Sequence, residues 1–210
     1  MQSTKSQATA TEILKSEHDV ILVVLDCLEK IAGDASAGGG LDVLSAQEVI
    51  EVLGTFADRC HHGKEEGALF PMLVAKGLPR DVGPVAVMLG EHEQGRAEIA
   101  GMRAALADGP AATERFVAHA RGYVELLRDH IAKENGVLFP MADGMLDAGE
   151  QAELLAAFEH VETDDLGSGV HERLLALVDR LAARLGVVAR ERPVLAGGCC
   201  HHGPGRGACG

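Results

Sequence analysis

The sequence predicts an all-α protein: an up-down-up-down four-helix bundle with two additional C-terminal helices and a flexible Cys/His/Gly tail. Three observations lead to this prediction. The 210 residues are 47% hydrophobic but only 3% aromatic, with no Trp, and such a composition favours helices over strands. Apolar residues recur at helical spacing in four long segments. Glycine and proline mark the connections between those segments.

Each bundle helix is predicted from its apolar stripe and its end signals. The first should span residues 11–32, before Gly33. The second should open at Ser45 with a capping-box pattern and run through residues 45–69, ending just before a proline. The third should span residues 84–107, with proline in its first turn. The fourth should run from residue 111 to just before Pro140.

The chain divides into four predicted regions: a flexible N-terminus (1–10), the bundle (11–145), a C-terminal helical extension (146–190) and a disordered Cys/His-rich tail (191–210). In the extension, residues 150–162 and 171–185 look helical, and Gly167-Ser168-Gly169 separates them. The glycine-rich tail cannot bury a core. Its soft side chains could bind metal but lack the paired spacing of a zinc module: Cys199, Cys200, His201, His202 and Cys209.

Composition also bears on partners and location. The formal net charge is −13 and no basic stripe is present, which argues against nucleic acid as a partner. No run of about 18 apolar residues exists, so no membrane span is expected. The five cysteines form an odd set that does not resemble a secreted disulfide framework, and a reducing cytoplasm is expected. The oligomeric state stays open.

A repeated segment carries the main chemical signal. Residues 59–72 align without gaps on residues 128–141, with nine of fourteen positions identical. Each copy contains His-x-x-x-Glu: His61 with Glu65, and His130 with Glu134. On a helix this spacing places imidazole and carboxylate one turn apart on the same face.

A second repeat extends the pattern to all four helices. Glu17-His18-Asp19 opens the first half much as Glu91-His92-Glu93 opens the second. Two helical hairpins related by a pseudo-twofold axis are therefore expected, each supplying one His and one His-x-x-x-Glu. Burying six such groups unpaired would cost about 1–3 kcal/mol each, whereas a multivalent cation satisfies them together. The predicted metal ligands are His18, His61, Glu65, His92, His130 and Glu134.

The donor types narrow the choice of metal. Imidazole together with carboxylate suits iron, manganese or zinc. The predicted ligands include no cluster of inward-facing thiolates, the feature that would favour a structural zinc site. Glu65 and Glu134 come from facing helices and could each bridge two metals.

Neighbouring residues are predicted to lie outside the site. Helical phase places His62 and Glu66 on a solvated face, and His119 lies about 16 Å along its helix from His130. Cys60 is expected to be a small buried hydrophobic residue. The remaining histidines of the extension, His160 and His171, are expected at the surface.

These segments resemble the hemerythrin-like family, also called the HHE cation-binding domain, over residues 11–142. The resemblance implies a four-helix bundle that holds two iron ions as a non-haem di-iron centre, with the six predicted ligands as its iron ligands. Oxygen-carrying members have a second His one turn after the helix-three His, where this chain has Arg96, and an Asp where Asn135 stands. The chain is more similar to bacterial di-iron proteins linked to nitric-oxide stress and to repair of iron centres.

Three functions therefore compete. The first is a non-haem di-iron protein that binds or reduces oxygen, nitric oxide or peroxide, in sensing or in protection against oxidative and nitrosative stress. The second is iron storage or donation. The third is a structural bundle with a zinc site. Whether there is enzymatic turnover stays open at this level.

Overall fold

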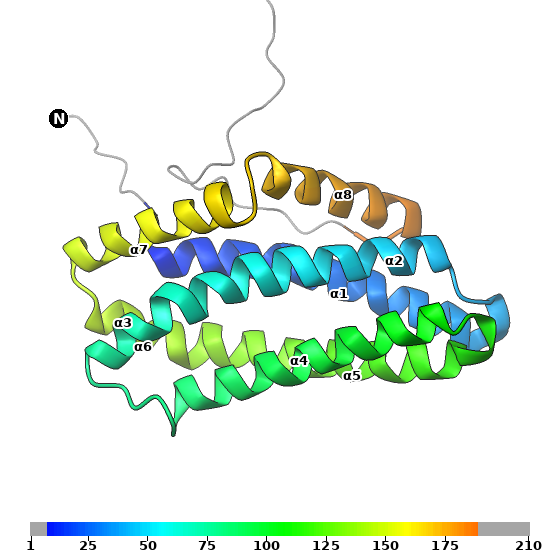
Figure 1. The fold of residues 1–210 in the computed structure, drawn as a ribbon, viewed down its shortest axis with the longest axis horizontal. Helices are drawn as coiled ribbons and strands as arrows, with labels where there is room; N and C mark the ends of the chain where they lie inside the picture. Colours follow the sequence, from blue (N-terminus) through cyan, green and yellow to red (C-terminus); the bar gives the residue numbers. More distant parts are fainter. Residues whose placement is uncertain (1–7, 189–210) are drawn as a thin grey trace, which may run out of the picture.

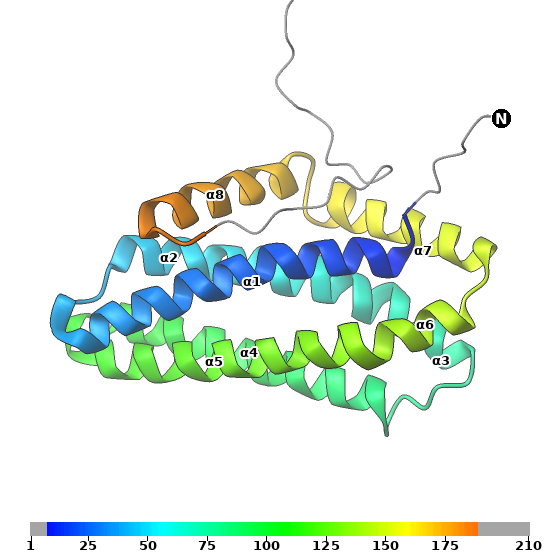
Figure 2. The same cartoon turned by 180° about the vertical axis from the view of Figure 1, so that it is seen from behind.

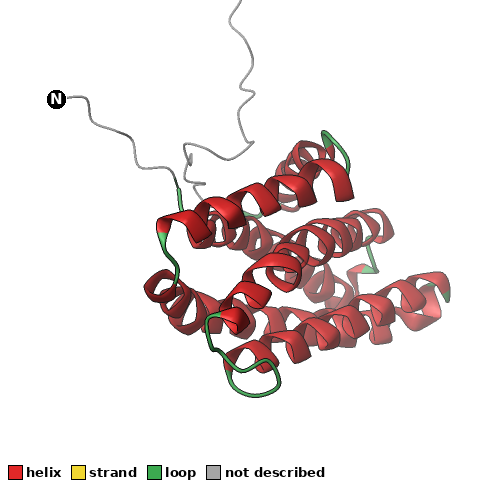
Figure 3. Cartoon of the chain, turned by 60° about the vertical axis from the view of Figure 1, so that its left-hand side comes forward, coloured by secondary structure: helices red, strands yellow, loops and turns green. Residues whose placement is uncertain are grey.

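A computed structural model describes residues 8–188, and every regular element within that range is a helix. The all-helical class is thus confirmed. Figure 3 shows helices joined by short loops throughout the described part of the chain. The predicted disordered tail, with its Cys and His residues, lies outside the described residues, as do positions 1–7.

Four long helical rods lie side by side along the long axis of the molecule (Figure 1). The second and fourth rods each consist of two α-helices joined by π-helical turns. The rods are α1 (Ala10–Asp34), α2 with α3 (Val43–Val52 and Phe70–Ala75), α4 (Pro84–Ala107), and α5 with α6 (Thr113–Lys133 and Phe139–Met145).

The C-terminal extension forms α7 (Ala148–His160) and α8 (Val170–Leu185). Both helices pack on one side of the bundle, with α8 along α1 and α2, and α7 near α1 and the turn that precedes α3 (Figure 2). The predicted break at Gly167 to Gly169 is present, since both glycines have positive φ. None of the described helices combines the length and apolarity needed to cross a membrane.

The start of α2 differs from its predicted capping box. Its N-cap is Asp42, whose side chain accepts hydrogen bonds from the Ser45 backbone N–H at 3.1 Å and from the Ser45 hydroxyl at 2.6 Å. Ser45 therefore lies inside the first turn, and the prediction that it opens the helix is wrong. An aspartate three residues upstream is as good a cap as a serine, so the pattern was ambiguous.

Proline does not end the second and fourth rods, which also corrects a prediction. The π-helical turns Glu65–Leu69 and Glu134–Leu138 precede Pro71 and Pro140. Each closes with an N–H···O=C bond spanning five residues, from Phe70 to Glu65 in the first copy. Because proline lacks an N–H, it fits where the regular α-helical ladder is already interrupted.

The apolar interior consists of two clusters separated along the bundle. One contains residues from the C-terminal part of α1, the N-terminal parts of the second and fourth rods, the C-terminal part of α4, and α8. The other contains residues from the opposite end of each rod, with Leu154 and Phe158 of α7. In every rod the predicted ligands lie at or near the boundary of the two clusters, so a polar layer crosses the bundle.

Candidate metal centre

All six predicted ligands are buried, and they converge from the four rods. The first group of converging side chains is His18, His61, Glu65 and Glu134. The second is His62, His92, His130 and again Glu65. Within each group the potential ligand atoms all lie within 4.8 Å of one another.

The four predicted histidines form two close pairs, one in each half. His18 Nε2 lies 2.9 Å from His61 Nε2, and His92 Nε2 lies 3.2 Å from His130 Nε2. Each pair therefore combines the histidine of a Glu-His segment with that of the following His-x-x-x-Glu segment. The two halves thus pair corresponding histidines of the repeats.

Each carboxylate of the two His-x-x-x-Glu segments faces one imidazole from each half. Glu134 Oε2 lies 3.1 Å from His18 Nε2 and 3.3 Å from His130 Nε2. Glu65 Oε1 lies 3.6 Å from His61 Nε2, and its Oε2 lies 3.4 Å from His92 Nε2. Both carboxylates are thus placed between the two histidine pairs.

None of the four oxygens of Glu65 and Glu134 has a hydrogen-bond partner among residues 8–188, although all four are buried. The imidazole nitrogens are close, but they do not approach with hydrogen-bond geometry. Carboxylate oxygens buried in this way are strongly disfavoured unless a cation compensates them.

Outer carboxylates hold the two His-x-x-x-Glu histidines in orientation. Glu17 Oε2 accepts from His61 Nδ1 at 2.9 Å, and Glu91 Oε2 accepts from His130 Nδ1 at 3.0 Å. These glutamates are the first residues of the repeated Glu-His segments. Such a carboxylate fixes the protonated nitrogen at Nδ1 and leaves the Nε2 lone pair for a metal.

The other two histidines are oriented by the residue that follows each repeat glutamate. His18 Nδ1 donates to the Asn135 Oδ1 at 3.0 Å, and His92 Nδ1 donates to Glu66 Oε1 at 2.7 Å. With all four Nδ1 atoms donating outward, the four Nε2 lone pairs face one another. That arrangement is repulsive for neutral rings, and a cation between the lone pairs makes it attractive.

Two lysines bind the outer glutamates. Lys64 forms ion pairs with Glu17 and, at 2.5 Å, with Glu162 of the extension, while Lys133 forms one with Glu91. The Lys64 side chain is 0% exposed and that of Lys133 is 43% exposed. Burial opposes the ammonium of Lys64, but the negative charges around it raise its pKa, so it is charged.

Arg96 stands where the oxygen-carrying members of the family that the sequence resembles have a second histidine. Its guanidinium binds Asp58 at 2.8 Å, Glu66 at 2.5 Å and Glu93 at 2.7 Å. Because Glu66 accepts from His92, Arg96 supports the orientation of that ring and does not supply a ligand itself.

The local environment shifts the acid–base behaviour of the site. Burial, followed by the charge of Glu134, raises the pKa of Glu65 well above its usual value. Burial and then His18 lower the pKa of His61 to about 4. His61 is therefore neutral at pH 7, as a metal ligand must be.

The prediction that His62 and Glu66 lie on a solvated face is wrong. His62 is 3% exposed, and its ring stacks on that of His92 with centroids 3.8 Å apart. The cause is the π-helical stretch Leu53–His62, whose wider turns invalidate a phase counted at 3.6 residues. The matching residue Ile131 is apolar and buried, which was the available signal. Glu66 is partly buried and binds His92.

The expectations for the other side chains have mixed outcomes. His119 and His160 are 40% and 63% exposed and belong to neither group, as expected. Cys60 is buried, also as expected. His171 is only 7% exposed, which corrects its surface assignment. Its Nδ1 lies 3.9 Å from Cys60 Sγ, because α8 begins against the bundle.

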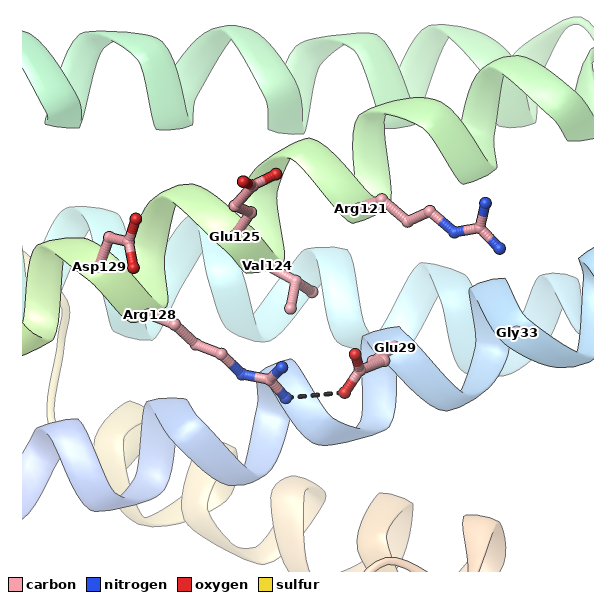
Figure 4. A pocket seen from close by; sticks show the side chains of 7 residues that line it. All are labelled: Glu29, Gly33, Arg121, Val124, Glu125, Arg128 and Asp129. Carbon is pink, nitrogen blue, oxygen red and sulfur yellow. Dashed lines mark hydrogen bonds and ion pairs between the residues drawn. The ribbon is translucent and has the colours of Figure 1, made fainter.

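A surface groove of about 470 Å³ lies between α1 and α5 (Figure 4). Its walls carry charges of both signs, and Arg128 crosses it to bind Glu29 at 2.8 Å. None of the residues that line it belongs to the two converging groups.

Comparison with known proteins identifies the domain. The family model described as the hemerythrin HHE cation-binding domain matches residues 9–142. The chain is 24% identical over 183 residues to the uncharacterized protein Rv1995 of Mycobacterium tuberculosis and equally to the uncharacterized protein Mb2018 of Mycobacterium bovis. The alignment covers 85% of this chain and 71% of each relative. No solved structure gives a significant match. The chain belongs to the hemerythrin HHE cation-binding domain family.

Proposed function

We propose that the bundle holds two iron ions between its halves and uses them to bind or reduce a small ligand, namely oxygen, nitric oxide or peroxide. The role would be sensing or protection against oxidative and nitrosative stress. One observation supports this most directly. Four imidazole lone pairs and two carboxylates without hydrogen bonds converge in one buried layer.

The geometry suggests how two ions would be held. His18 and His61 would bind one ion, and His92 and His130 the other. Glu65 and Glu134 would bridge, because each faces an imidazole from both halves. Mixed nitrogen and oxygen donors suit iron, which supplies one-electron chemistry and open positions for a small ligand when bound.

Protein side chains around this layer would control orientation and water. Glu17 and Glu91 keep the Nδ1 protons of His61 and His130 in place. Two phenylalanines form apolar walls: Phe139 stacks on His18 at 5.4 Å, and Phe70 on His92 at 5.9 Å. Each ring comes from one half and covers a histidine of the other. Exclusion of water strengthens the electrostatic interactions within such a site.

Burial favours a resident centre over iron donation. The six predicted ligands are each at most 1% exposed, so iron could leave only after the rods separate. A donor should lose iron quickly to a chelator, whereas this centre should lose it slowly, at the rate of local opening. Timed transfer of iron to a strong chelator distinguishes the two functions.

Metal analysis and spectroscopy test the main proposal. Protein reconstituted with ferrous iron without oxygen should contain about two irons per chain, as the paired ligand groups imply. After oxidation, an oxo-bridged diferric centre should absorb in the near ultraviolet and respond to azide or nitric oxide. Protein that takes up one zinc and no iron would exclude this function and favour the structural zinc site.

A further inference from the structure

We propose that His62 is a fifth imidazole ligand, so that one of the two metals has three imidazoles and the other has two. This inference rests on the proposed two-metal centre and adds to it a ligand and an asymmetry. His62 belongs to the second rod but lies beside the histidines of the other half.

The surroundings of His62 provide no other role for its ring nitrogens. The residue is 3% exposed, and neither Nδ1 nor Nε2 has a hydrogen-bond partner among residues 8–188. Asp58 Oδ1 lies 3.6 Å from His62 Nδ1, too far for a hydrogen bond, and that oxygen is bound by Arg96 at 2.8 Å. A buried imidazole with two unpartnered nitrogens is unfavourable unless something else satisfies it.

The ring is directed at the second metal group. A nitrogen of His62 lies within 4.8 Å of the ligand atoms of Glu65, His92 and His130. The ring is nearly parallel to that of His92, with an interplanar angle of 14° and a centroid separation of 3.8 Å. It meets the ring of His130 edge to face, with centroids 5.6 Å apart. A cation at this group would therefore satisfy a nitrogen of all three rings.

The repeat shows that packing alone does not require histidine here. Ile131 stands at the matching position in the other copy and is 4% exposed. An apolar side chain thus occupies the equivalent position of the repeat. Among residues 8–188, the group that contains His18 and His61 has no third imidazole, so its metal would keep more open positions for an exogenous ligand.

Cobalt(II)-loaded protein counts the imidazole ligands directly. Each coordinated ring contributes one strongly shifted, solvent-exchangeable N–H proton resonance. Wild-type protein with two cobalt ions should show five such resonances, from His18, His61, His62, His92 and His130. The variant His62→Ile, which copies the residue of the other half, should show four. Its affinity for one of the two cobalt ions should fall by at least roughly 100-fold, beyond the effect of an outer hydrogen bond.

Two further variants make the result interpretable. His119→Ala removes an exposed histidine on α5 and should keep all five resonances and both affinities. His62→Gln keeps a polar side chain of similar length and should also show four resonances. It replaces His62→Ile as the test variant if the circular dichroism spectrum of His62→Ile is no longer helical. Four resonances in both wild type and His62→Ile, with equal cobalt affinities, would overturn the role of His62 alone. Wild-type protein that binds no divalent metal would overturn the two-metal centre as well.

Discussion

The two halves of the bundle, residues 10–75 and 84–145, have the same arrangement of candidate ligands but differ in the residues that surround those ligands. In both, a Glu-His segment supplies an imidazole and an outer carboxylate, and the next rod supplies a second imidazole, a lysine and a central carboxylate. In both, a π-helical turn begins at that central glutamate. The chemistry of the site therefore depends on features that both halves keep.

The differences concern what surrounds this shared centre. Glu162 from the extension encloses Lys64, whereas Lys133 is 43% exposed. The carboxylate of Glu66 accepts a hydrogen bond from His92, whereas the corresponding acceptor for His18 is the side-chain amide oxygen of Asn135. The extension packs on only one side of the bundle (Figure 1). Part of the asymmetry thus comes from outside the repeated unit.

The largest effect is expected from substitution of the central glutamates, which both halves of the bundle have. Glu65→Gln and Glu134→Gln should each reduce iron from about two per chain to one or none, because each loses a negative charge that faces imidazoles of both halves. Iron analysis after anaerobic reconstitution measures this. Glu93→Gln, an exposed glutamate on α4, is the matched control. If either central variant kept two irons and an unchanged spectrum, its bridging role would be rejected.

The lysines test the main difference. Lys64→Met leaves Glu17 and Glu162 without their buried cation and should lower the free energy of unfolding by about 3–5 kcal/mol. Lys133→Met removes a partly exposed ion pair and should lower it by about 0–1 kcal/mol. Urea unfolding of the metal-free variants at neutral pH compares them. Equal losses would show that the extension does not protect the first half.

The outer glutamates should have a smaller and graded effect. Glu17→Gln and Glu91→Gln keep a hydrogen-bond acceptor for the histidine but remove its charge, which typically weakens metal binding about 10- to 100-fold. The loss should be greater for Glu17, whose side chain is 5% exposed, than for Glu91 at 13%. Competition with a chelator measures the affinities, and the reverse order would contradict the inferred protection by the extension.

The smallest effect concerns the tail, which belongs to neither half. Truncation after Leu195 should leave iron content, the near-ultraviolet spectrum and the thermal midpoint nearly unchanged, because both ligand groups lie within the described residues. Only weak extra binding of soft metals should decrease. Loss of the iron spectrum on truncation would show that tail cysteines or histidines contribute to the centre.

The sequence predicted the shared centre well because repeats and helical spacing report on it directly. Residues 84–107 form α4 as expected, and all six predicted ligands are buried together. The burial of His62 was not predicted because counting at 3.6 residues per turn assumes a regular α-helix, whereas residues 53–62 form a π-helix with wider turns. The pairing of Glu17 with His61, and of Glu162 with Lys64, was also missed. Such contacts depend on how separate helices pack, which spacing within one helix does not reveal.

The polar layer that crosses the interior bears on how the protein unfolds. Each rod passes from one apolar cluster to the other near its predicted ligands, so without a cation two small cores are separated by groups that repel one another. Each end of the molecule can then open as its own cooperative unit. Bound ions would tie all four rods together at the boundary between these units. Metal would thereby decide whether the chain melts in one transition or in two.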